Sequence, residues 1–405
     1  MRYASYVKSL LTFEEAQARI LAAARALSAE PVPVAAAAGR VLAEDVTAAV
    51  DLPPFPSSAM DGYAVRTADL PGTLLVVGES AAGTPFSETL GPGEAVAIST
   101  GAVVPEGADA VAPVEIVCNR DNSIETDREL EPGSSIRPRG GDARAGDVVA
   151  AAGQRLGPAG IAAIAAAGVA SVSCSRRPRV AVLATGSELV VPGEPLGPGQ
   201  IYESNALMLA AALAAAGAEI VGAPAVPDDE ASLREALERG LECDVLVTSG
   251  GVSVGEHDLV REVEQELGVE ESFWRVAIKP GKPLAFGTRG DTLVFGLPGN
   301  PVSALVGAEL FVKPALRALQ GMSEPLPRFE PGRLGSDLQR NPERDEFVRA
   351  RARNEGDAVA LEPLRGQESH MIASASTADA LVHIPRGNGK LTAGSVISWL
   401  RLNAP

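Results

Sequence analysis

The feature that most constrains the fold is a central stretch, residues 179–319, in which short apolar runs alternate with helical patterns. Apolar runs at Val180–Ala184, Asp244–Thr248 and Thr292–Phe295 each lead into a glycine-containing turn, with the sequences TGSEL, SGG and GLPGN. Buried strands that alternate with helices predict a doubly wound, mostly parallel α/β sheet. Ligands of such sheets bind at the carboxyl ends of the strands, so we expect these turns to line one site.

The regions on either side of this stretch have different sequence patterns. Thr12 and Glu15 form a capping-box pattern, which predicts a helix that extends to about Leu27. Between residues 46 and 149, short β-leaning runs separated by Gly, Pro and Asp predict a small β-rich domain. After Gly321, a Pro- and Gly-rich stretch leads to further β-leaning runs, which predict a small C-terminal β-barrel or sandwich.

Composition excludes several classes of protein. The 405 residues include 35 Lys and Arg against 52 Asp and Glu, and this net charge of -17 disfavours generic nucleic-acid binding. Three histidines cannot form a His-rich metal centre, and three widely spaced cysteines form neither a CxxC zinc site nor a disulfide framework. No stretch has the ~20 strongly apolar residues of a membrane span, and the first residues lack a signal-peptide pattern. We therefore expect a cytoplasmic protein with no membrane partner.

Four loops combine glycines, hydroxyl groups or cations in ways that suit a bound anion. Two of them follow buried strands and offer backbone N–H groups and hydroxyls, in the sequences TGSEL and SGGVSVG. The sequence KPGKP places two ammonium groups three residues apart, and GLPGNP begins a helix with an N-cap Asn and a Pro. Each loop is also consistent with an ordinary turn or with solvated lysines. The candidates are Thr185, Gly186, Ser187, Ser249, Gly250, Gly251, Ser253, Arg275, Lys279, Lys282, Asn300 and Pro301.

Several carboxylates in loops are candidate ligands of a cation. Mg²⁺ prefers oxygen ligands and often combines one or two carboxylates with substrate phosphate. For each of these residues the alternative is a solvated charge or a helix cap, and Asp228 is placed to cap the helix that follows it. The candidates are Asp61, Asp142, Glu188, Asp228 and Asp258.

Six motifs occur along the chain in the order SAMDGYAVR, STGAVVPEGADAV, LATGSELV, SGGVSVGEHD, IKPGKPLAFG and GLPGNPVSAL. In this order and spacing the chain resembles the molybdopterin molybdenumtransferases, the MoeA proteins, which are similar to the E domain of gephyrin. The resemblance covers nearly the whole chain and implies four domains. They are an elongated discontinuous domain (residues 1–45 and 143–177), an inserted β-rich domain (46–142), an α/β molybdopterin-binding domain (178–322) and a C-terminal β-barrel domain (323–405).

The resemblance implies a reaction in which molybdate is inserted into adenylylated molybdopterin, with Mg²⁺, releasing AMP and molybdenum cofactor. It also implies a homodimer whose active cleft lies between the α/β domain of one protomer and the inserted domain of the other. An upstream molybdopterin adenylyltransferase and downstream molybdoenzymes would be the protein partners.

Roles carry over to residues at matching motif positions. Asp61 and Thr100 would line the cleft from the inserted domain, and Asp142 would lie beside them. The expected catalytic residues are Asp61, Thr100, Asp142, Glu188, Asp258, Lys279 and Lys282, with Asp61, Asp142 and Glu188 as metal ligands. The expected substrate-binding residues are Asp228, Pro298, Arg349 and Ser369, together with Thr185, Gly186, Ser187, Ser249, Gly250, Gly251, Ser253, Arg275, Asn300 and Pro301.

Two positions depart from the family pattern. Gly141 stands where the family has a Glu beside Asp142, which removes one carboxylate near the expected metal. Arg261 stands where Lys is common, which keeps the charge.

Two other functions are consistent with the chain. One is a molybdopterin adenylyltransferase, although that enzyme usually consists of the α/β domain alone. The other is a carrier or scaffold that binds the pterin without turning it over, as gephyrin's receptor clustering illustrates. ATP consumption would identify the first, and pterin binding without AMP release would identify the second.

Overall fold

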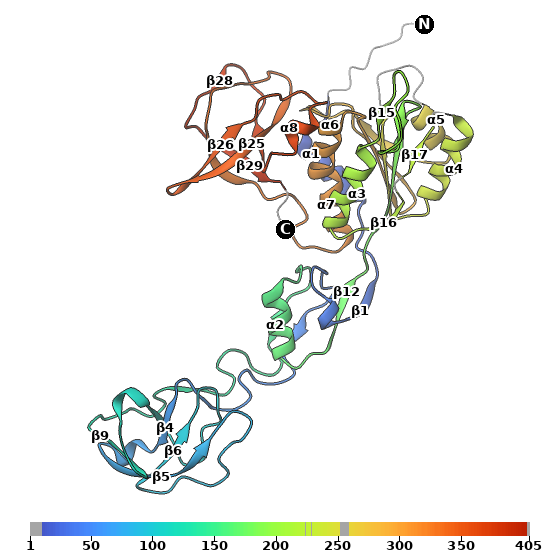
Figure 1. The fold of residues 1–405 in the computed structure, drawn as a ribbon. Coiled ribbons are helices and arrows are strands. Elements are labelled where there is room, and N and C mark those ends of the chain that lie inside the picture. The colour runs from blue at the N-terminus through green and yellow to red at the C-terminus, as the bar shows by residue number, and fades with distance from the viewer. Residues whose placement is uncertain (1–9, 223, 228, 252–258, 403–405) are drawn as a thin grey trace.

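The computed structural model describes residues 10–222, 224–227, 229–251 and 259–402. The molecule is elongated, with a β-rich unit at one end and the α/β and C-terminal units together at the other (Figure 1). A slender unit, made from two separate stretches of the chain, connects the two ends.

The α/β unit is built on one sheet. Its strands are β13 (Arg179–Thr185), β16 (Glu219–Gly222), β17 (Ala225–Val226), β18 (Val245–Ser249), β19 (Glu270–Trp274), β21 (Ala285–Arg289) and β22 (Thr292–Leu297). They lie in the order β16-β13-β18-β22-β21-β19, and β17 also pairs with β13. Neighbouring strands from β16 to β22 are parallel, whereas β21 is antiparallel to both of its neighbours, β22 and β19. The prediction of a mostly parallel sheet is confirmed.

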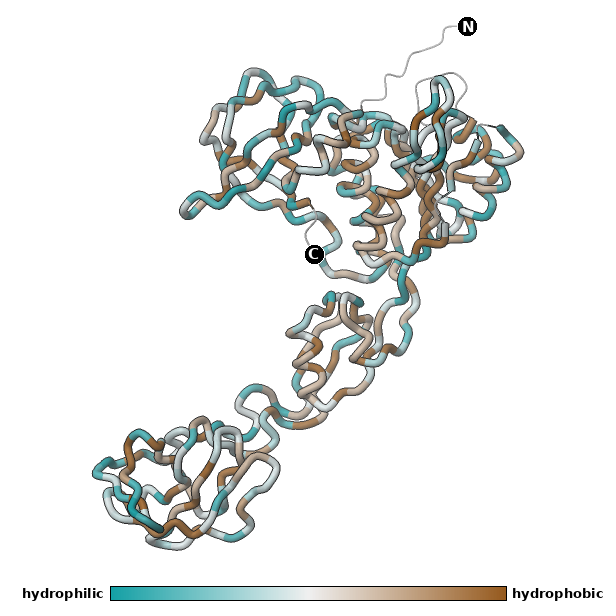
Figure 2. The backbone as a smooth tube through the Cα atoms, in the orientation of Figure 1, coloured by the Kyte–Doolittle hydropathy of each residue, from teal (hydrophilic) through white to brown (hydrophobic). Residues whose placement is uncertain are grey.

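Helices cover both faces of this sheet, and alternate residues of β13 pack into the two layers. Val180 and Val182 belong to one core with α1, α3, α6 and α7, whereas Ala181 and Leu183 belong to a second core with α4 and α5. Both faces are buried, which explains why the strands read as continuous apolar runs and are brown in Figure 2. The helices are α1 (Phe13–Ala23), α3 (Asn205–Ala215), α4 (Glu230–Gly240), α5 (Leu259–Glu266), α6 (Pro301–Gly307) and α7 (Lys313–Leu319).

The first helix packs on the α/β unit through a buried amide. Thr12 and Glu15 form the expected capping box at its start. Between α6 and α7 the helix passes through a π-helical turn, and Pro314 there has no N–H to donate to the Leu310 carbonyl four residues earlier. The Gln17 side chain of α1 donates to that carbonyl at 2.7 Å. The domain bounds implied by the resemblance place this helix in the elongated domain, but it shares the core of the α/β sheet.

The slender unit joins two distant stretches. β1 (Ala29–Pro33) pairs with β12 (Ser171–Ser175), β2 (Val46–Thr47) pairs with β11 (Val148–Ala150), and α2 (Pro158–Ala166) packs on them. Between these stretches lies the β-rich unit, whose main sheet has the strand order β7-β4-β6-β5-β9-β8. Its strands are β3 (Ser57–Ser58), β4 (Gly62–Val65), β5 (Gly72–Ser80), β6 (Glu94–Ile98), β7 (Ala110–Pro113), β8 (Cys118–Arg120), β9 (Ser123–Thr126) and β10 (Ile136–Arg137).

The C-terminal unit is a barrel closed by pairing of β25 with both β26 and β27, as expected. The short strand β20 (Ile278–Lys279) of the α/β unit runs parallel to β25, with Ile278 opposite Asp345, so the two units share backbone pairing. The elements are β23 (Glu330–Leu334), β24 (Leu338–Gln339), β25 (Asp345–Glu355), β26 (Ala358–Pro363), α8 (Ile372–Ala375), β27 (Ala380–Ile384), β28 (Lys390–Leu391) and β29 (Val396–Arg401).

One predicted boundary is wrong. The first helix ends at Ala23 rather than near Leu27, because Ala24 is already extended. The strand β19 ends at Trp274, because the next residue, Arg275, adopts a φ of +86°, which lies outside the β region. Among the described residues, no helix has the length and apolarity to cross a membrane.

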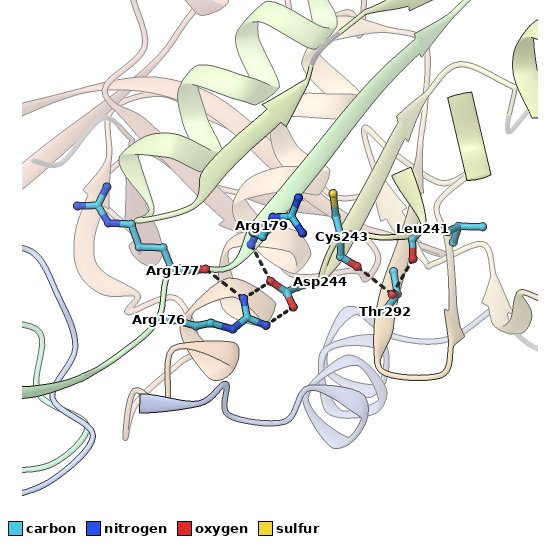
Figure 3. Close-up of polar contacts among 7 residues, drawn as sticks. All are labelled: Arg176, Arg177, Arg179, Leu241, Cys243, Asp244 and Thr292. Atoms are coloured by element: carbon cyan, nitrogen blue, oxygen red, sulfur yellow. Dashed lines mark hydrogen bonds and ion pairs between the residues drawn. The ribbon is translucent and has the colours of Figure 1, made fainter. Parts of the chain in front are cut away.

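The amino end of the sheet is held by a dense set of polar contacts (Figure 3). The Asp244 carboxylate accepts two hydrogen bonds from the Arg176 guanidinium, at 2.6 and 2.7 Å, and one from the Arg179 N–H at 2.7 Å. The Thr292 hydroxyl is within 3.2 Å of the Leu241 carbonyl and 2.9 Å of the Cys243 carbonyl. These contacts fix the starts of β13, β18 and β22 relative to one another.

Candidate functional site

A cavity of about 650 Å³ opens at the carboxyl ends of β13, β18 and β22, as the fold class leads one to expect. It is therefore at the end of the sheet opposite Asp244 and Thr292. Many of its lining residues were expected from the sequence, namely Thr185, Gly186, Glu188, Ser249, Gly250, Gly251, Asn300 and Pro301. Of the remaining candidates, Asp228, Ser253 and Asp258 lie outside the described residues.

Glycines form two turns that line the cavity. Gly250 has a φ of +100°, and a Cβ there would lie 2.6 Å from the Thr185 carbonyl oxygen, so no side chain fits. A Cβ on Gly186 would lie 2.7 Å from Glu188 Oε2, which shows that the Glu188 carboxylate folds back over Gly186. The turn at Gly250 therefore requires glycine, whereas the turn at Gly186 carries the carboxylate of Glu188 at the cavity. Ser187 lies on the first turn and is exposed.

The third side of the cavity is the start of α6. Asn300 is at the N-cap and Pro301 at the first helical position, as predicted, although no hydrogen bond from the Asn300 side chain caps the helix. The Pro298 carbonyl lies 3.4 Å from the Ser249 hydroxyl, which donates to it. The Val302 N–H donates to the Ser369 carbonyl at 3.0 Å, which docks a loop of the C-terminal unit on this helix. The next residue of that loop, His370, lines the cavity.

Arg349, an expected substrate ligand, forms hydrogen bonds to the loop that contains Ser369 and His370. Its side chain is 1% exposed, and its guanidinium donates to the carbonyls of Met371, Gly366 and Glu368 at 2.9, 2.9 and 3.2 Å. Burial lowers the pKa of the Arg349 guanidinium below its usual value. In this structure Arg349 positions the His370 loop, and its contact with substrate stays a prediction.

The cationic loop KPGKP lies beside α6. A Cβ on Gly281 would lie 3.6 Å from the Ser303 carbonyl oxygen, so the loop packs on the first turn of that helix. The Lys279 ammonium is 2.7 Å from Glu346 Oε1 of the C-terminal barrel, and the Lys279 side chain remains half exposed. Arg275 stacks on the Trp274 ring, with 3.7 Å between the guanidinium carbon and the ring centroid.

The remaining carboxylates lie elsewhere. Asp61 accepts hydrogen bonds from the Thr100 N–H and hydroxyl at 2.7 and 2.8 Å, which hold the pKa of Asp61 below its usual value. This pair belongs to the β-rich unit, at the opposite end of the molecule from the cavity (Figure 1). Asp142 is exposed in the loop that leads back from that unit. One chain therefore does not bring Asp61, Asp142 and Glu188 together.

This separation determines whether the expected Mg²⁺ ligands of one chain can share a metal ion. Among the described residues, no group of three or more His, Cys, Asp or Glu side chains is arranged to hold a metal ion. Within one chain, the three expected Mg²⁺ ligands do not form a site. The cap of α4 is Asp229, which accepts the Ser232 N–H at 2.9 Å, so the neighbouring residue takes the capping position considered for Asp228.

Sequence reasoning missed the arm that follows Glu188. Here β14 (Leu189–Val190) pairs with β15 (Ile201–Tyr202), and the arm then enters α3 through Glu203, Ser204 and Asn205, all of which line the cavity. The Glu203 carboxylate is buried and accepts the Ala206 N–H at 2.7 Å, so it caps α3. The signal that could have found this region is the run of polar residues immediately before an apolar helix.

Comparison with known families covers nearly the whole chain. A family model described as the MoeA N-terminal region (domain I and II) matches residues 11–168. A model described as a probable molybdopterin binding domain matches residues 181–318, and the MoeA C-terminal region (domain IV) matches residues 331–402.

Individual proteins agree with these matches. The chain is 38% identical to the molybdopterin molybdenumtransferase of Haemophilus influenzae, over 89% of this chain and 91% of the relative. It is also 38% identical to molybdopterin molybdenumtransferase 2 of Mycobacterium tuberculosis, over 96% and 98%. A crystal structure of the molybdopterin biosynthesis MoeA protein from Pyrococcus horikoshii superposes with a TM-score of 0.84 at 29% identity, covering 97% of this chain and 100% of that one.

Proposed function

The chain belongs to the MoeA family, and on that premise we propose that it inserts molybdate into adenylylated molybdopterin and releases AMP and molybdenum cofactor. The observation that carries the proposal is the cavity at the carboxyl ends of β13, β18 and β22, together with the glycine turns that line it. Its size and open backbone suit a large anionic ligand rather than a small metabolite.

The residues of this chain would act chiefly by binding and orienting anions. The turns at Gly186 and Gly250 would bring backbone and the Ser187 and Ser249 side chains to the phosphate oxygens, although the N–H groups of Gly186 and Gly250 themselves donate to the Val226 and Leu297 carbonyls. The two lysines of KPGKP supply positive charge beside the start of α6, where an oxyanion is favoured. Attack on phosphorus by water or by a molybdate oxygen breaks the phosphoanhydride bond and releases AMP. The two pterin thiols then bind molybdenum, and their protons leave with one molybdate oxygen as water. The sulfurs belong to the pterin, so no protein cysteine is needed.

A second copy of the chain would complete the site. Glu188 lines the cavity, whereas Asp61, Thr100 and Asp142 lie in or beside the β-rich unit of the same elongated chain. In a homodimer, the β-rich unit of the partner would close over the cavity and bring these carboxylates to the substrate phosphates. Mg²⁺ would be held there by Glu188 of one chain and by Asp61 and Asp142 of the other.

The proposal extends to the place of the reaction. An enzyme that adenylylates molybdopterin must supply the substrate, and enzymes that use molybdenum cofactor must accept the product. We place these exchanges in the cytoplasm, in keeping with the composition of the chain.

The direct test is AMP release from adenylylated molybdopterin, measured with Mg²⁺ in the presence and absence of molybdate. Release that depends on molybdate supports the transferase. Binding of the pterin without release contradicts it and favours a carrier, in which case Gly141→Glu would be the first variant to restore activity. Consumption of ATP with free molybdopterin would identify an adenylyltransferase instead.

A further inference from the structure

Asn205 connects three loops that are far apart in the sequence. It is the first residue of α3 and lines the cavity. Its side-chain Nδ2 donates to the Ser249 hydroxyl at 2.9 Å and to the Gly299 carbonyl at 2.7 Å. Ser249 ends β18, and Gly299 follows β22 by two residues. One amide group therefore spans the ends of two neighbouring strands.

These two strand ends need such a connection, because the chain leaves them in opposite directions. After β18 the chain proceeds to α5, which packs on one face of the sheet, and after β22 it proceeds to α6, which packs on the other. Neighbouring parallel strands whose connections diverge in this way leave a crevice between them. The cavity occupies this crevice, and Asn205 reaches across it.

Two other hydrogen bonds join these strand ends. The Gly250 N–H donates to the Leu297 carbonyl at 3.1 Å, and the Ser249 hydroxyl donates to the Pro298 carbonyl at 3.4 Å. Asn205 extends the connection to Gly299, where a Cβ would lie only 3.7 Å from the Gly250 Cα. A primary amide has two N–H donors in a fixed plane, which suits the simultaneous contact with two acceptors.

The position of Asn205 is itself fixed. Glu203, two residues before Asn205, is 6% exposed. Its carboxylate accepts a hydrogen bond from the Ala206 N–H at 2.7 Å, which holds the first turn of α3. The Glu203 N–H donates to the Val190 carbonyl at 2.8 Å, which attaches the same turn to the arm. The amide of Asn205 thus projects from a rigid support.

We infer that Asn205 is a positioning residue for ligand binding, which holds the Ser249–Gly251 turn and the Pro298–Asn300 turn at the separation that an anionic ligand needs. It acts through these turns rather than by touching the reacting atoms. The ligand part of this inference rests on the proposed function, because that function identifies the anion as adenylylated molybdopterin.

The chain contains a matched control in Gln320. Its side-chain Nε2 also donates to two backbone carbonyls, those of Ala216 and Leu316 at 3.1 and 3.0 Å. Ala216 is the C-cap of α3, so Gln320 holds the far end of the helix that Asn205 begins. Asn205→Ala and Gln320→Ala therefore each remove one primary amide and the two hydrogen bonds it donates, at opposite ends of α3, but only the first affects the cavity.

The first experiment is amide hydrogen exchange on the full-length protein without ligand. The Gly250 N–H donates to the Leu297 carbonyl at 3.1 Å, so its exchange reports on the turn. We expect Asn205→Ala to speed exchange at Gly250 by about tenfold, as for loss of one or two hydrogen bonds, and Gln320→Ala to leave it unchanged. Asn205→Asp keeps the size of the side chain but loses its N–H donors, so it should speed exchange at Gly250 as Asn205→Ala does. It replaces Asn205→Ala if that variant folds poorly. Equal rates at Gly250 in the wild type and in both Asn205 variants would overturn the inference.

The second experiment is binding of adenylylated molybdopterin, followed by the fluorescence of the pterin. Asn205→Ala should weaken binding by about tenfold, Asn205→Asp by more because it adds a negative charge, and Gln320→Ala should match the wild type. A merely structural role would weaken binding equally in Asn205→Ala and Gln320→Ala and would overturn the inference. If the wild-type protein releases no AMP, the proposed function fails, but the exchange comparison still decides the role of Asn205.

Discussion

The two ends of the central sheet are built in opposite ways. At the amino end, Asp244 and Thr292 fasten the starts of three strands with hydrogen bonds that involve charged groups or buried carbonyls. At the carboxyl end, glycine turns surround a cavity, and the amide of Asn205 bridges two of them. Rigidity at one end leaves the other free to present open backbone to a ligand. Substitutions at the two ends should therefore affect different properties of the protein.

The largest effect is expected at the carboxyl end. Glu188→Ala should lower turnover by at least about a hundredfold, because a carboxylate that faces substrate phosphates acts mainly in the transition state. The melting temperature should stay close to that of the wild type, since Glu188 is exposed. Glu194→Ala, which removes an exposed carboxylate from the same arm, is the control and should retain full activity. Near-normal turnover in Glu188→Ala would remove the carboxylate from the proposed site.

The next effect is expected at the amino end and concerns stability. Asp244→Ala should lower the free energy of unfolding by about 2 kcal/mol, because it leaves the partly buried Arg176 guanidinium without its partner. Turnover per folded molecule should not change. Asp291→Ala, which removes a 90% exposed partner of Arg25 at the same end of the sheet, should change stability by less than about 0.5 kcal/mol. Urea unfolding followed by circular dichroism measures both values.

The pH dependence of this effect has a definite sign. Burial alone would raise the pKa of Asp244, but hydrogen bonds from Arg176 and Arg179 outweigh it and hold the pKa below the usual value. A lowered pKa contributes stability that is fully present above the unfolded-state pKa of about 3.9 and is lost as pH falls through the folded-state pKa. The difference in unfolding free energy between the wild type and Asp244→Asn should therefore be constant near neutral pH and shrink below about pH 4. A difference that grows on acidification would contradict this assignment.

The smallest effect is expected for Thr292→Val. The substitution keeps the shape of the side chain but removes the hydroxyl that donates to the Leu241 and Cys243 carbonyls. It should lower the free energy of unfolding by about 1 kcal/mol. Turnover should be unchanged. A loss of activity per folded molecule in this variant would show that the two ends of the sheet are coupled.

Local patterns in the sequence predicted much of this molecule. The apolar runs and their glycine turns specified the strands of the sheet and the end at which a cavity forms, and Thr12 with Glu15 specified the start of α1. Both depend on neighbours within a few residues. The family motifs added the order of the units.

Contacts between distant residues were beyond such patterns. Gln17 and Leu310 are separated by 293 positions, Arg176 and Asp244 by 68, and Asn205 and Gly299 by 94. The local sequences of Gln17, Arg176 and Asn205 do not indicate that their side chains reach these distant partners. Likewise, Arg275 follows the end of β19 in a backbone conformation that its neighbours in the sequence do not indicate. The sequence thus located the cavity but not the groups that hold it together.

The central claim is that the carboxyl end of the sheet is half of a site, completed by Asp61 on the β-rich unit of a second copy. Mixing the inactive variants Asp61→Ala and Glu188→Ala tests it most directly, through molybdate-dependent AMP release. A mixed dimer would contain one intact site and one doubly altered site, so the mixture should recover about a quarter of wild-type activity after subunit exchange. No recovery, with mixed dimers shown to form, would contradict a site shared between protomers.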